Sequence, residues 1–414
     1  MNSQTAKKRS AITTNMVIAV LVLLAIVTGY NYFFAPFSEL PQSLVETEQP
    51  TIAPSPEATV QDYRYMVESM TAEEKISQLL ALPIDLDAYD ASAAAVASDS
   101  SKPVAETAGL IDFIVGGGAP QEEKSAWGFV TLFGTKVDYE LAQQAIMAYT
   151  NTQEDDLPIW TLVDHEGGTV QRLSGEGFTT LPSWREACSM DSEQRGELWQ
   201  KSANELQKVG VDVVLAPMLD IAANHPVLKT RICSDDPETT AVAAGEFVAT
   251  MQSFGIMSVI KHFPGIGQTK KDLHKSFDTV TVTQDDVELY KFILGAYPQT
   301  GVMVSHVGVD NQDESIPCSL SVSCVGQIHQ LFADTILYSD ALNMKAAGVD
   351  GGVAATAQKA LEAGLTVLVF EPGVSESDLR EVQTQLVGRY NDSYEFRELV
   401  NTAVELVLQH KLAK

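Results

Sequence analysis

Residues 257–274 read MSVIKHFPGIGQTKKDLH, an apolar run that stops at two basic residues. The run Met257–Ile260 has the apolar composition of a strand that is buried on both faces, as in a parallel sheet. It ends in Lys261-His262, and a loop with Pro and Gly then leads to Asp272-Leu-His274. Titratable side chains at the end of a buried strand are typical of the active-site face of a barrel enzyme.

The same pattern recurs along the chain. Titratable residues follow four other short apolar runs: Asp164 after Ile159–Val163, Asp220 after Val211–Leu215, His306 after Val302–Val304 and Asp340 after Ile336–Tyr338. Two further runs, Phe129–Phe133 and Leu365–Phe370, also have the composition of buried strands. Because the carboxyl ends of barrel strands open onto one face, we expect the titratable side chains to meet there.

Segments with helix signals alternate with these runs. Capping residues and glycine stops predict helices that begin after Thr71 and Thr283, and others over residues 198–209, 237–254 and 394–412. Such alternation fits a doubly wound sheet or a barrel. No G-x-G-x-x-G or phosphate-binding loop motif supports the nucleotide-binding, doubly wound alternative. We therefore predict an α/β fold, a (β/α)8 TIM-type barrel that forms a single catalytic domain over residues 62–414.

The first 37 residues predict a membrane segment before the barrel. Lys7, Lys8 and Arg9 precede an apolar stretch, residues 12–34, which is long enough to span a bilayer as a helix. No small-residue cleavage site closes it, so we predict an uncleaved transmembrane anchor rather than a removed signal peptide. The expected protein is single-pass in the cell membrane, with its catalytic domain outside the cytoplasm. Residues 38–61 predict a flexible stalk, and residues 91–109 a flexible insertion.

Composition excludes some partners. The formal net charge is −28, which disfavours nucleic acid because phosphate binding needs clustered Lys and Arg. The four cysteines, Cys188, Cys233, Cys318 and Cys324, have no zinc-site spacing. We expect buried free thiols, and the alternative is one or two disulfides if the domain lies outside the cytosol.

The loop after Lys261-His262 is one of four linked motifs. Residues 261–274 match the pattern K-H-F-P-G-x-G-x-T-x-x-D-x-H. The segment VDHEGGTVQR at 163–172 is similar to D-x-E-G-G-x-V-x-R, RICSDDP at 231–237 to R-x-F-x-x-D-P, and YSDALNM at 338–344 to F-S-D-x-L-x-M. Together, in this order, they resemble glycoside hydrolase family 3, in its branch of single-domain β-N-acetylglucosaminidases.

The resemblance implies a retaining exo-β-N-acetylglucosaminidase without a cofactor or metal, whose partner is an amino-sugar-containing glycan from the cell wall or another source. Asp340 is the implied nucleophile, which forms a covalent glycosyl-enzyme. His274 is the implied acid/base, and Asp272 is its orienting partner. The terminal sugar is expected to be bound by Asp164, Arg172, Arg231, Lys261 and His262. The alternative roles are an N-cap for Asp340 and structural ion pairs for the others, such as Asp164 with Lys261.

The acid/base loop departs from the family pattern, with Ile266 where His is frequent and Gln268 where Asp is frequent. Three alternatives to hydrolysis stay open. A glycoside phosphorylase would use the same fold and a histidine acid/base. A non-catalytic sugar-binding protein would explain the departures. A metal-dependent barrel hydrolase would use His165, His262, Asp272, His274 and His306, but their spacing matches no metal motif.

Overall fold

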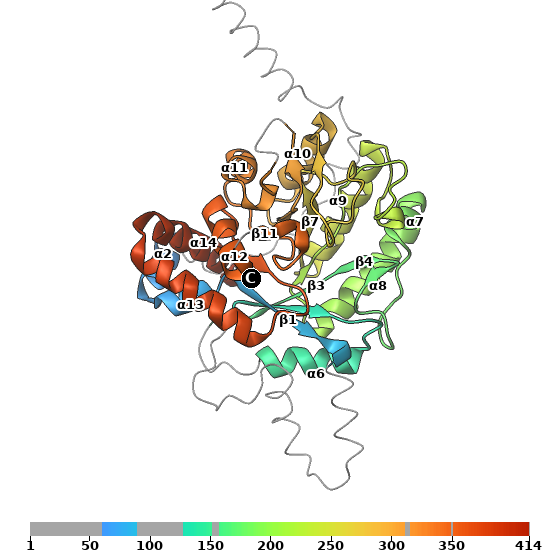
Figure 1. Ribbon diagram of the computed structural model, residues 1–414. Coiled ribbons are helices and arrows are strands. Elements are labelled where there is room, and N and C mark those ends of the chain that lie inside the picture. The colour runs from blue at the N-terminus through green and yellow to red at the C-terminus, as the bar shows by residue number, and fades with distance from the viewer. Residues whose placement is uncertain (1–59, 89–126, 151–156, 311–314, 349–350, 414) are drawn as a thin grey trace, which may run out of the picture.

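The computed structural model describes residues 60–88, 127–150, 157–310, 315–348 and 351–413 (Figure 1). Within these residues, eight parallel strands form the main sheet in the order in which they occur along the chain. They are β1 (Leu80–Asp85), β2 (Phe129–Phe133), β3 (Trp160–Val163), β6 (Val213–Val214), β7 (Met257–Phe263), β9 (Gly301–Val304), β11 (Leu337–Ser339) and β12 (Leu368–Val369). Both faces of the sheet are largely buried, which explains why the strands read as continuous apolar runs.

The sheet closes on itself. Strand β12 pairs with β1 through Leu80–Leu368 and Ala81–Val369. At the other edge, Tyr338 of β11 forms a parallel bridge with Val367, which immediately precedes β12. The eight strands therefore make the predicted barrel, and all of them except β1 coincide with apolar runs identified in the sequence.

Helices cover the outside of the barrel (Figure 1). They are α2 (Val60–Ser69), α3 (Ala72–Ser77), α6 (Tyr139–Thr150), α7 (Trp184–Ser189), α8 (Ser192–Val209), α9 (Pro237–Ser253), α10 (Gln284–Ala296), α11 (Val322–Leu331), α12 (Gly352–Ala363), α13 (Glu376–Asp392) and α14 (Tyr394–Leu412). The predicted caps are present: Thr71 and Thr283 form capping boxes, and Gly210 ends α8 in the left-handed region at φ 96°. Helix α8 begins six residues before the predicted start, after the N-cap Asp191.

The loops at the carboxyl ends of the strands contain short strands and 3₁₀ turns. Strands β4 (His165–Gly167) and β5 (Val170–Gln171) form an antiparallel pair, and β8 (Thr279–Val280) pairs in parallel with β10 (Gly308–Val309). Three 3₁₀ turns add to them: η3 (Lys229–Arg231), η4 (Cys318–Leu320) and η5 (Lys345–Ala347).

Aromatic side chains fill the amino-terminal end of the barrel. The ring of Phe129 lies edge-on to Trp160 at 6.2 Å and to Tyr338 at 6.3 Å. The ammonium group of Lys411 from α14 lies 4.3 Å from the centre of the Phe129 ring. This end of the barrel is therefore closed by side chains, as expected for a packed barrel core.

The fold prediction needs correction in one part, the transmembrane helix placed before the barrel. Among the described residues, no helix combines the length and the apolar character needed to cross a membrane. Helix α14 has 19 residues, but it carries the charged residues Glu395, Arg397, Glu398, Glu405 and Lys411. The span expected at residues 12–34, the stalk and the 91–109 insertion all lie outside the described residues.

The expectation of free thiols is also wrong. Cys188 of α7 is bonded to Cys233, and Cys318 of η4 to Cys324 of α11. No cysteine is free, and all four lie in described segments. The first disulfide joins α7 to the segment that follows η3, and the second closes a short loop between η4 and α11.

Candidate active site

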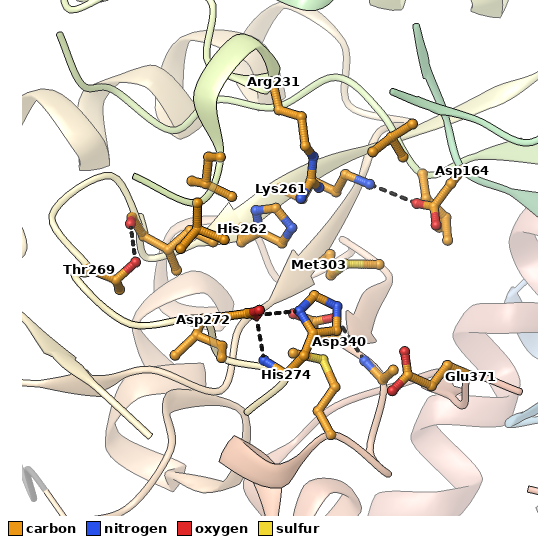
Figure 2. A pocket seen from close by; sticks show the side chains of 18 of the residues that line it. Asp164, Arg231, Lys261, His262, Thr269, Asp272, His274, Met303, Asp340 and Glu371 are labelled. Atoms are coloured by element: carbon orange, nitrogen blue, oxygen red, sulfur yellow. Dashed lines mark hydrogen bonds and ion pairs between the residues drawn. The ribbon is translucent and has the colours of Figure 1, made fainter. Parts of the chain in front are cut away.

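One pocket opens at the carboxyl ends of the barrel strands (Figure 2). All eight side chains predicted for the site line it: Asp164, Arg172, Arg231, Lys261, His262, Asp272, His274 and Asp340. Lys261 and His262 lie at the end of β7, and the other six lie in segments after β3, β6, β7 and β11, which are far apart in the sequence. The barrel geometry gathers them because the carboxyl ends of its parallel strands share one face.

Lys261 is the centre of an ion-pair network on one wall of the pocket. Its ammonium lies 2.8 Å from Asp164 Oδ1 and 2.6 Å from Glu166 Oε1. Arg231 donates to both Glu166 oxygens at 2.8 Å, and Arg172 lies 3.4 Å from Asp164 Oδ2. The structural ion pair expected as an alternative for Asp164 and Lys261 is thus present. It holds charged donors and acceptors in fixed positions, as a binding surface for sugar hydroxyls requires.

The network keeps all its members charged. Burial acts to raise the pKa of the Asp164 carboxyl, but Lys261 and Arg172 outweigh it and hold the pKa well below its ordinary value. Burial also opposes the charge of Glu166, yet Arg231 and Lys261 lower its pKa to about 2. The carboxylates in turn raise the pKa of Lys261 despite its burial.

Glu166 has no role predicted from the sequence, although the residue lies inside the motif at 163–172. A signal was available, because Glu166 follows Asp164 by two residues and shares its partner Lys261. Its contact with Arg231 joins segments 65 residues apart, which no local pattern reveals.

Asp220 is a second residue without a predicted role. Its carboxylate accepts a hydrogen bond from His262 Nδ1 at 2.8 Å and another from the Ile266 backbone N–H at 2.7 Å. The pair fixes the His262 ring, and with Nδ1 engaged, Nε2 is the ring nitrogen left for a ligand. Asp220 therefore positions both a predicted sugar contact and the base of the acid/base loop.

The two departures from the family pattern help to hold that loop. Ile266 is buried, and its carbonyl accepts from the hydroxyl of Thr269 at 2.9 Å. The Gln268 amide donates to the carbonyl of Thr281 at 2.8 Å. A Cβ at Gly267 would lie 2.0 Å from the carbonyl oxygen of Ile221, so only glycine fits there. Ile266 and Gln268 thus serve packing and hydrogen bonding at the start of the loop.

His274 and Asp272 form a dyad at the tip of the same loop (Figure 2). Asp272 Oδ1 lies 2.9 Å from His274 Nδ1 and also accepts from the His274 backbone N–H. Desolvation acts to raise the pKa of Asp272, but the hydrogen bonds from His274 and from Lys275 together outweigh it and lower the pKa. An ionised Asp272 makes Nδ1 the donor and leaves Nε2 to exchange a proton with a ligand. The His274 ring remains more than half exposed.

Asp340 follows β11 on the floor of the pocket. Its Oδ1 accepts from the Ala341 backbone N–H at 2.8 Å. Burial acts to raise its pKa, but the neighbouring His306 and His262 and the Ala341 hydrogen bond lower it below the ordinary value. The alternative role of N-cap is wrong, because the next helical turn, η5, begins at Lys345 and its N-cap is Met344.

His306 supports the segment that carries Asp340. Its Nε2 lies 2.9 Å from the carbonyl oxygen of Ala341, and its Nδ1 lies 2.7 Å from the hydroxyl of Ser319. Since a carbonyl only accepts, Nε2 is the donor and the serine hydroxyl donates to Nδ1. Burial lowers the pKa of His306, consistent with a neutral ring. His306 therefore holds the backbone beside the nucleophile candidate.

The histidines of the metal alternative do not converge. His165 is fully buried and bonded to Ser202 at 2.8 Å, and His306 is bonded as described above. In the described part of the chain, no three His, Cys, Asp or Glu side chains are placed to hold a metal ion.

Glu371 is a further pocket residue that sequence analysis did not assign. It follows β12, and its side chain lies near His274 and Asp340 in Figure 2. The Asn343 side chain fixes its backbone, with Nδ2 donating to the Glu371 carbonyl and Oδ1 accepting from its N–H. Burial first, and then the charge of Asp340, raise the pKa of Glu371, while His274 and Arg172 act against the rise.

A family model described as "Glycosyl hydrolase family 3 N terminal domain" matches residues 116–408 of the chain. The chain belongs to glycoside hydrolase family 3. The resemblance seen in the four motifs is thereby confirmed, and the chain is a glycoside hydrolase.

Relatives of the family 3 chain include a protein named β-hexosaminidase from Glaesserella parasuis. The two are 31% identical over 245 residues, which cover 57% of the chain and 71% of the relative. A solved β-N-acetylhexosaminidase from Beutenbergia cavernae superposes with a TM-score of 0.67 at 24% identity, over 83% of the chain and 99% of that structure. A structure of a β-glucoside phosphorylase gives 0.66 at 18% identity, over 92% of the chain and 64% of the phosphorylase. At these identities the solved structures establish the fold alone.

Proposed function

We propose that the chain is a retaining exo-β-N-acetylglucosaminidase that removes a terminal β-linked N-acetylhexosamine through a covalent intermediate on Asp340. The observation that carries the proposal is the placement of an ionised, half-buried Asp340 and a His274–Asp272 dyad in one pocket. The protein from Glaesserella parasuis named β-hexosaminidase supports the choice of an amino sugar.

In the first step, Asp340 attacks the anomeric carbon while His274 protonates the leaving oxygen from Nε2. The charge of Asp340 also stabilises the positive charge that develops on the sugar ring. Asp272 stabilises the imidazolium form of His274 that this step requires. The exposed position of His274 at the tip of its loop suits a group that must reach the leaving oxygen.

In the second step, His274 has lost its proton and acts as the base. It accepts a proton from water as the water oxygen attacks the anomeric carbon, and the bond to Asp340 breaks with its electrons returning to the carboxylate. Two attacks on opposite faces leave the β configuration unchanged.

The pocket opens at the carboxyl face of the barrel, where the terminal sugar of the glycan would enter. The barrel below it is filled by Phe129, Trp160 and Tyr338, so a glycan enters only from the carboxyl face. The network of Asp164, Arg172, Arg231, Lys261 and His262 then meets the hydroxyls of the terminal sugar. Fixed charged groups give such hydrogen bonds strength and direction.

We further propose that the enzyme works outside the cytoplasm on cell-wall or other glycan fragments. The two disulfides support this location, because such bonds persist in oxidising compartments. Release of N-acetylglucosamine from purified cell-wall fragments, compared with release from chitin oligomers, measures which glycan is preferred.

The decisive experiment is to trap the intermediate. Treatment with a 5-fluoro N-acetylglucosaminyl reagent should add one sugar mass to the intact protein, and peptide mapping should place it on Asp340. The Asp340→Asn variant, treated in parallel, should stay unlabelled. A folded wild-type protein that neither forms the adduct nor hydrolyses p-nitrophenyl β-N-acetylglucosaminide would overturn the proposal.

A further inference from the structure

We propose that Glu371 selects the acceptor, by excluding anionic nucleophiles from the glycosyl-enzyme and leaving water as the partner. The inference rests on the proposed retaining mechanism and adds a specificity-determining residue to it. It concerns the choice between hydrolysis and phosphorolysis, which the fold alone does not make.

The position of Glu371 places its charge at the acceptor route. The side chain lines the same pocket as His274 and Asp340 (Figure 2). Figure 2 shows the Glu371 carboxylate on the side of the pocket where His274 and Asp340 lie. The acceptor approaches between these two groups, since it must reach His274 and the anomeric carbon bound to Asp340.

Glu371 is held in place but not neutralised. Asn343 fixes its backbone with two hydrogen bonds, of 3.1 and 2.9 Å. No ion pair to Glu371 occurs among the residues that the structure describes, whereas Asp164 and Glu166 both pair with Lys261. An unpaired carboxylate in a partly desolvated pocket repels an anion more strongly than it would in water.

The positive groups nearby offer an anion little compensation. Lys261 and Arg231 each bind Glu166, and Lys275 lies 3.2 Å from Asp272. The two other cations that line the pocket also lie near carboxylates: Arg172 is 3.4 Å from Asp164, and Lys271 is 4.0 Å from Asp278. These cations already have carboxylate partners. A phosphate dianion that approached the anomeric carbon would thus meet the charge of Glu371, while each of these cations is already close to a carboxylate of the protein.

The two competing second steps differ in proton transfer and in the charge of the acceptor. Water attacks the anomeric carbon, its proton passes to His274, and the bond to the Asp340 oxygen breaks with its electrons returning to that oxygen. A phosphate dianion attacks through an oxygen that carries no proton, so the sugar 1-phosphate forms without proton transfer and the same bond breaks. Only the phosphate route brings a new negative charge past Glu371.

The test measures product ratios from p-nitrophenyl β-N-acetylglucosaminide with three competing acceptors: inorganic phosphate, azide and methanol. Phosphate and azide are anions that yield the sugar 1-phosphate and the glycosyl azide, and methanol is neutral and yields the methyl glycoside. All acceptors compete for one intermediate, so each ratio to free sugar is independent of the folded fraction of a variant.

We expect wild type to give mainly free sugar. Glu371→Gln should raise both anion-derived ratios about tenfold, equivalent to about 1.4 kcal/mol, and leave the methanol ratio unchanged. Glu371→Ser, which also removes the charge, should act in the same direction. Glu362→Gln removes one negative charge on α12, where Glu362 pairs with Arg389 outside the pocket, and should change none of the ratios.

Three outcomes would overturn the inference. Wild type could already form mainly sugar 1-phosphate, the charge-removing variants could leave the anion ratios unchanged, or the methanol ratio could rise equally. The last result would mean that Glu371 positions groups or limits space rather than excluding charge. Absence of turnover in wild type, by contrast, would refute the proposed function itself.

Discussion

Two buried lysines lie at opposite ends of the barrel and have different partners. At the amino-terminal end, Lys411 donates to the carbonyl oxygens of Gly128 and Pro158 and to the side chain of Gln78, at 2.6, 3.0 and 3.1 Å. At the carboxyl-terminal end, Lys261 binds Asp164 and Glu166. Within the described parts of the chain, the acceptors of the first lysine are neutral, and the second lysine has two carboxylates.

The different partners of the two lysines indicate that Lys411 stabilises the fold and that Lys261 serves the active site. Burial lowers the pKa of Lys411 to about 7 against a smaller opposing effect of Asp212, whereas Asp164 and Glu166 raise the pKa of Lys261. The closed end ties the starts of neighbouring strands together. The open end keeps paired charges at a surface that a sugar can reach, in agreement with the division of barrel enzymes into a stability face and an active-site face.

The largest expected effect is at the open end. Asp340→Asn should lower kcat by at least about 10⁴-fold, because it removes the nucleophile while preserving shape. Thermal unfolding should change little, since Asp340 forms no ion pair within the described structure. Hydrolysis of p-nitrophenyl β-N-acetylglucosaminide and calorimetry measure both quantities. Residual activity near that of wild type would assign the chemistry to another residue.

The dyad should give the next effect. His274→Ala and Asp272→Asn should each reduce kcat/KM by about 10²- to 10⁴-fold, the usual contribution of general acid–base catalysis. A 2,4-dinitrophenyl leaving group needs little protonation, so cleavage of the glycosidic bond should suffer much less with that substrate. Burst kinetics separate the two steps. An equal loss with both leaving groups would argue against an acid role for His274.

A substitution at the closed, amino-terminal end of the barrel should lower stability and leave activity largely intact. Lys411→Ala should lower the free energy of unfolding by about 3 kcal/mol, because it leaves a cavity and unsatisfied carbonyl oxygens. Activity per folded molecule should persist. Lys411→Met, which keeps most of the volume, isolates the loss of the hydrogen bonds. Lys261→Met is the matched substitution at the open end and should abolish sugar binding. Similar loss of activity in both methionine variants would contradict the separation.

The smallest expected effect is on the unfolding temperature at acidic pH. The pKa of Glu166 is about 2 in the folded chain, against an ordinary value of 4.5. Its folded-state pKa is depressed, so its stabilisation is complete above pH 4.5 and is lost as the pH falls towards 2. Glu166→Gln should therefore flatten the decline of the unfolding temperature between about pH 5 and about pH 3. Lys411→Met should keep the wild-type decline, and parallel curves for all three proteins would exclude the assignment to Glu166.

Much of this arrangement follows from short patterns in the sequence. Apolar runs that end in Asp164, Lys261 and Asp340 predict both strands and pocket, because chain direction fixes where strand ends meet. Glu371 also follows a predicted strand, Leu365–Phe370, so the same rule could have identified it.

Other features depend on contacts between distant segments. The hydrogen bond of Asp220 to His262 joins positions 42 residues apart, and the Cys188–Cys233 disulfide joins positions 45 apart. Neither has a local signature. Strand β1 escaped prediction because Pro83 interrupts its pattern, and a proline cannot donate a hydrogen bond within a sheet.

The place of Lys411 also bears on the order of events during synthesis. Its bonds to Gly128 and Pro158 join residues 283 and 253 positions apart, and β1 completes the barrel by pairing with β12. The first strands thus leave the ribosome long before Lys411 and β12, which form hydrogen bonds with them in the folded barrel. Until then, their edges and carbonyl groups stay open to water or to a chaperone, and such long-range closure makes folding slow.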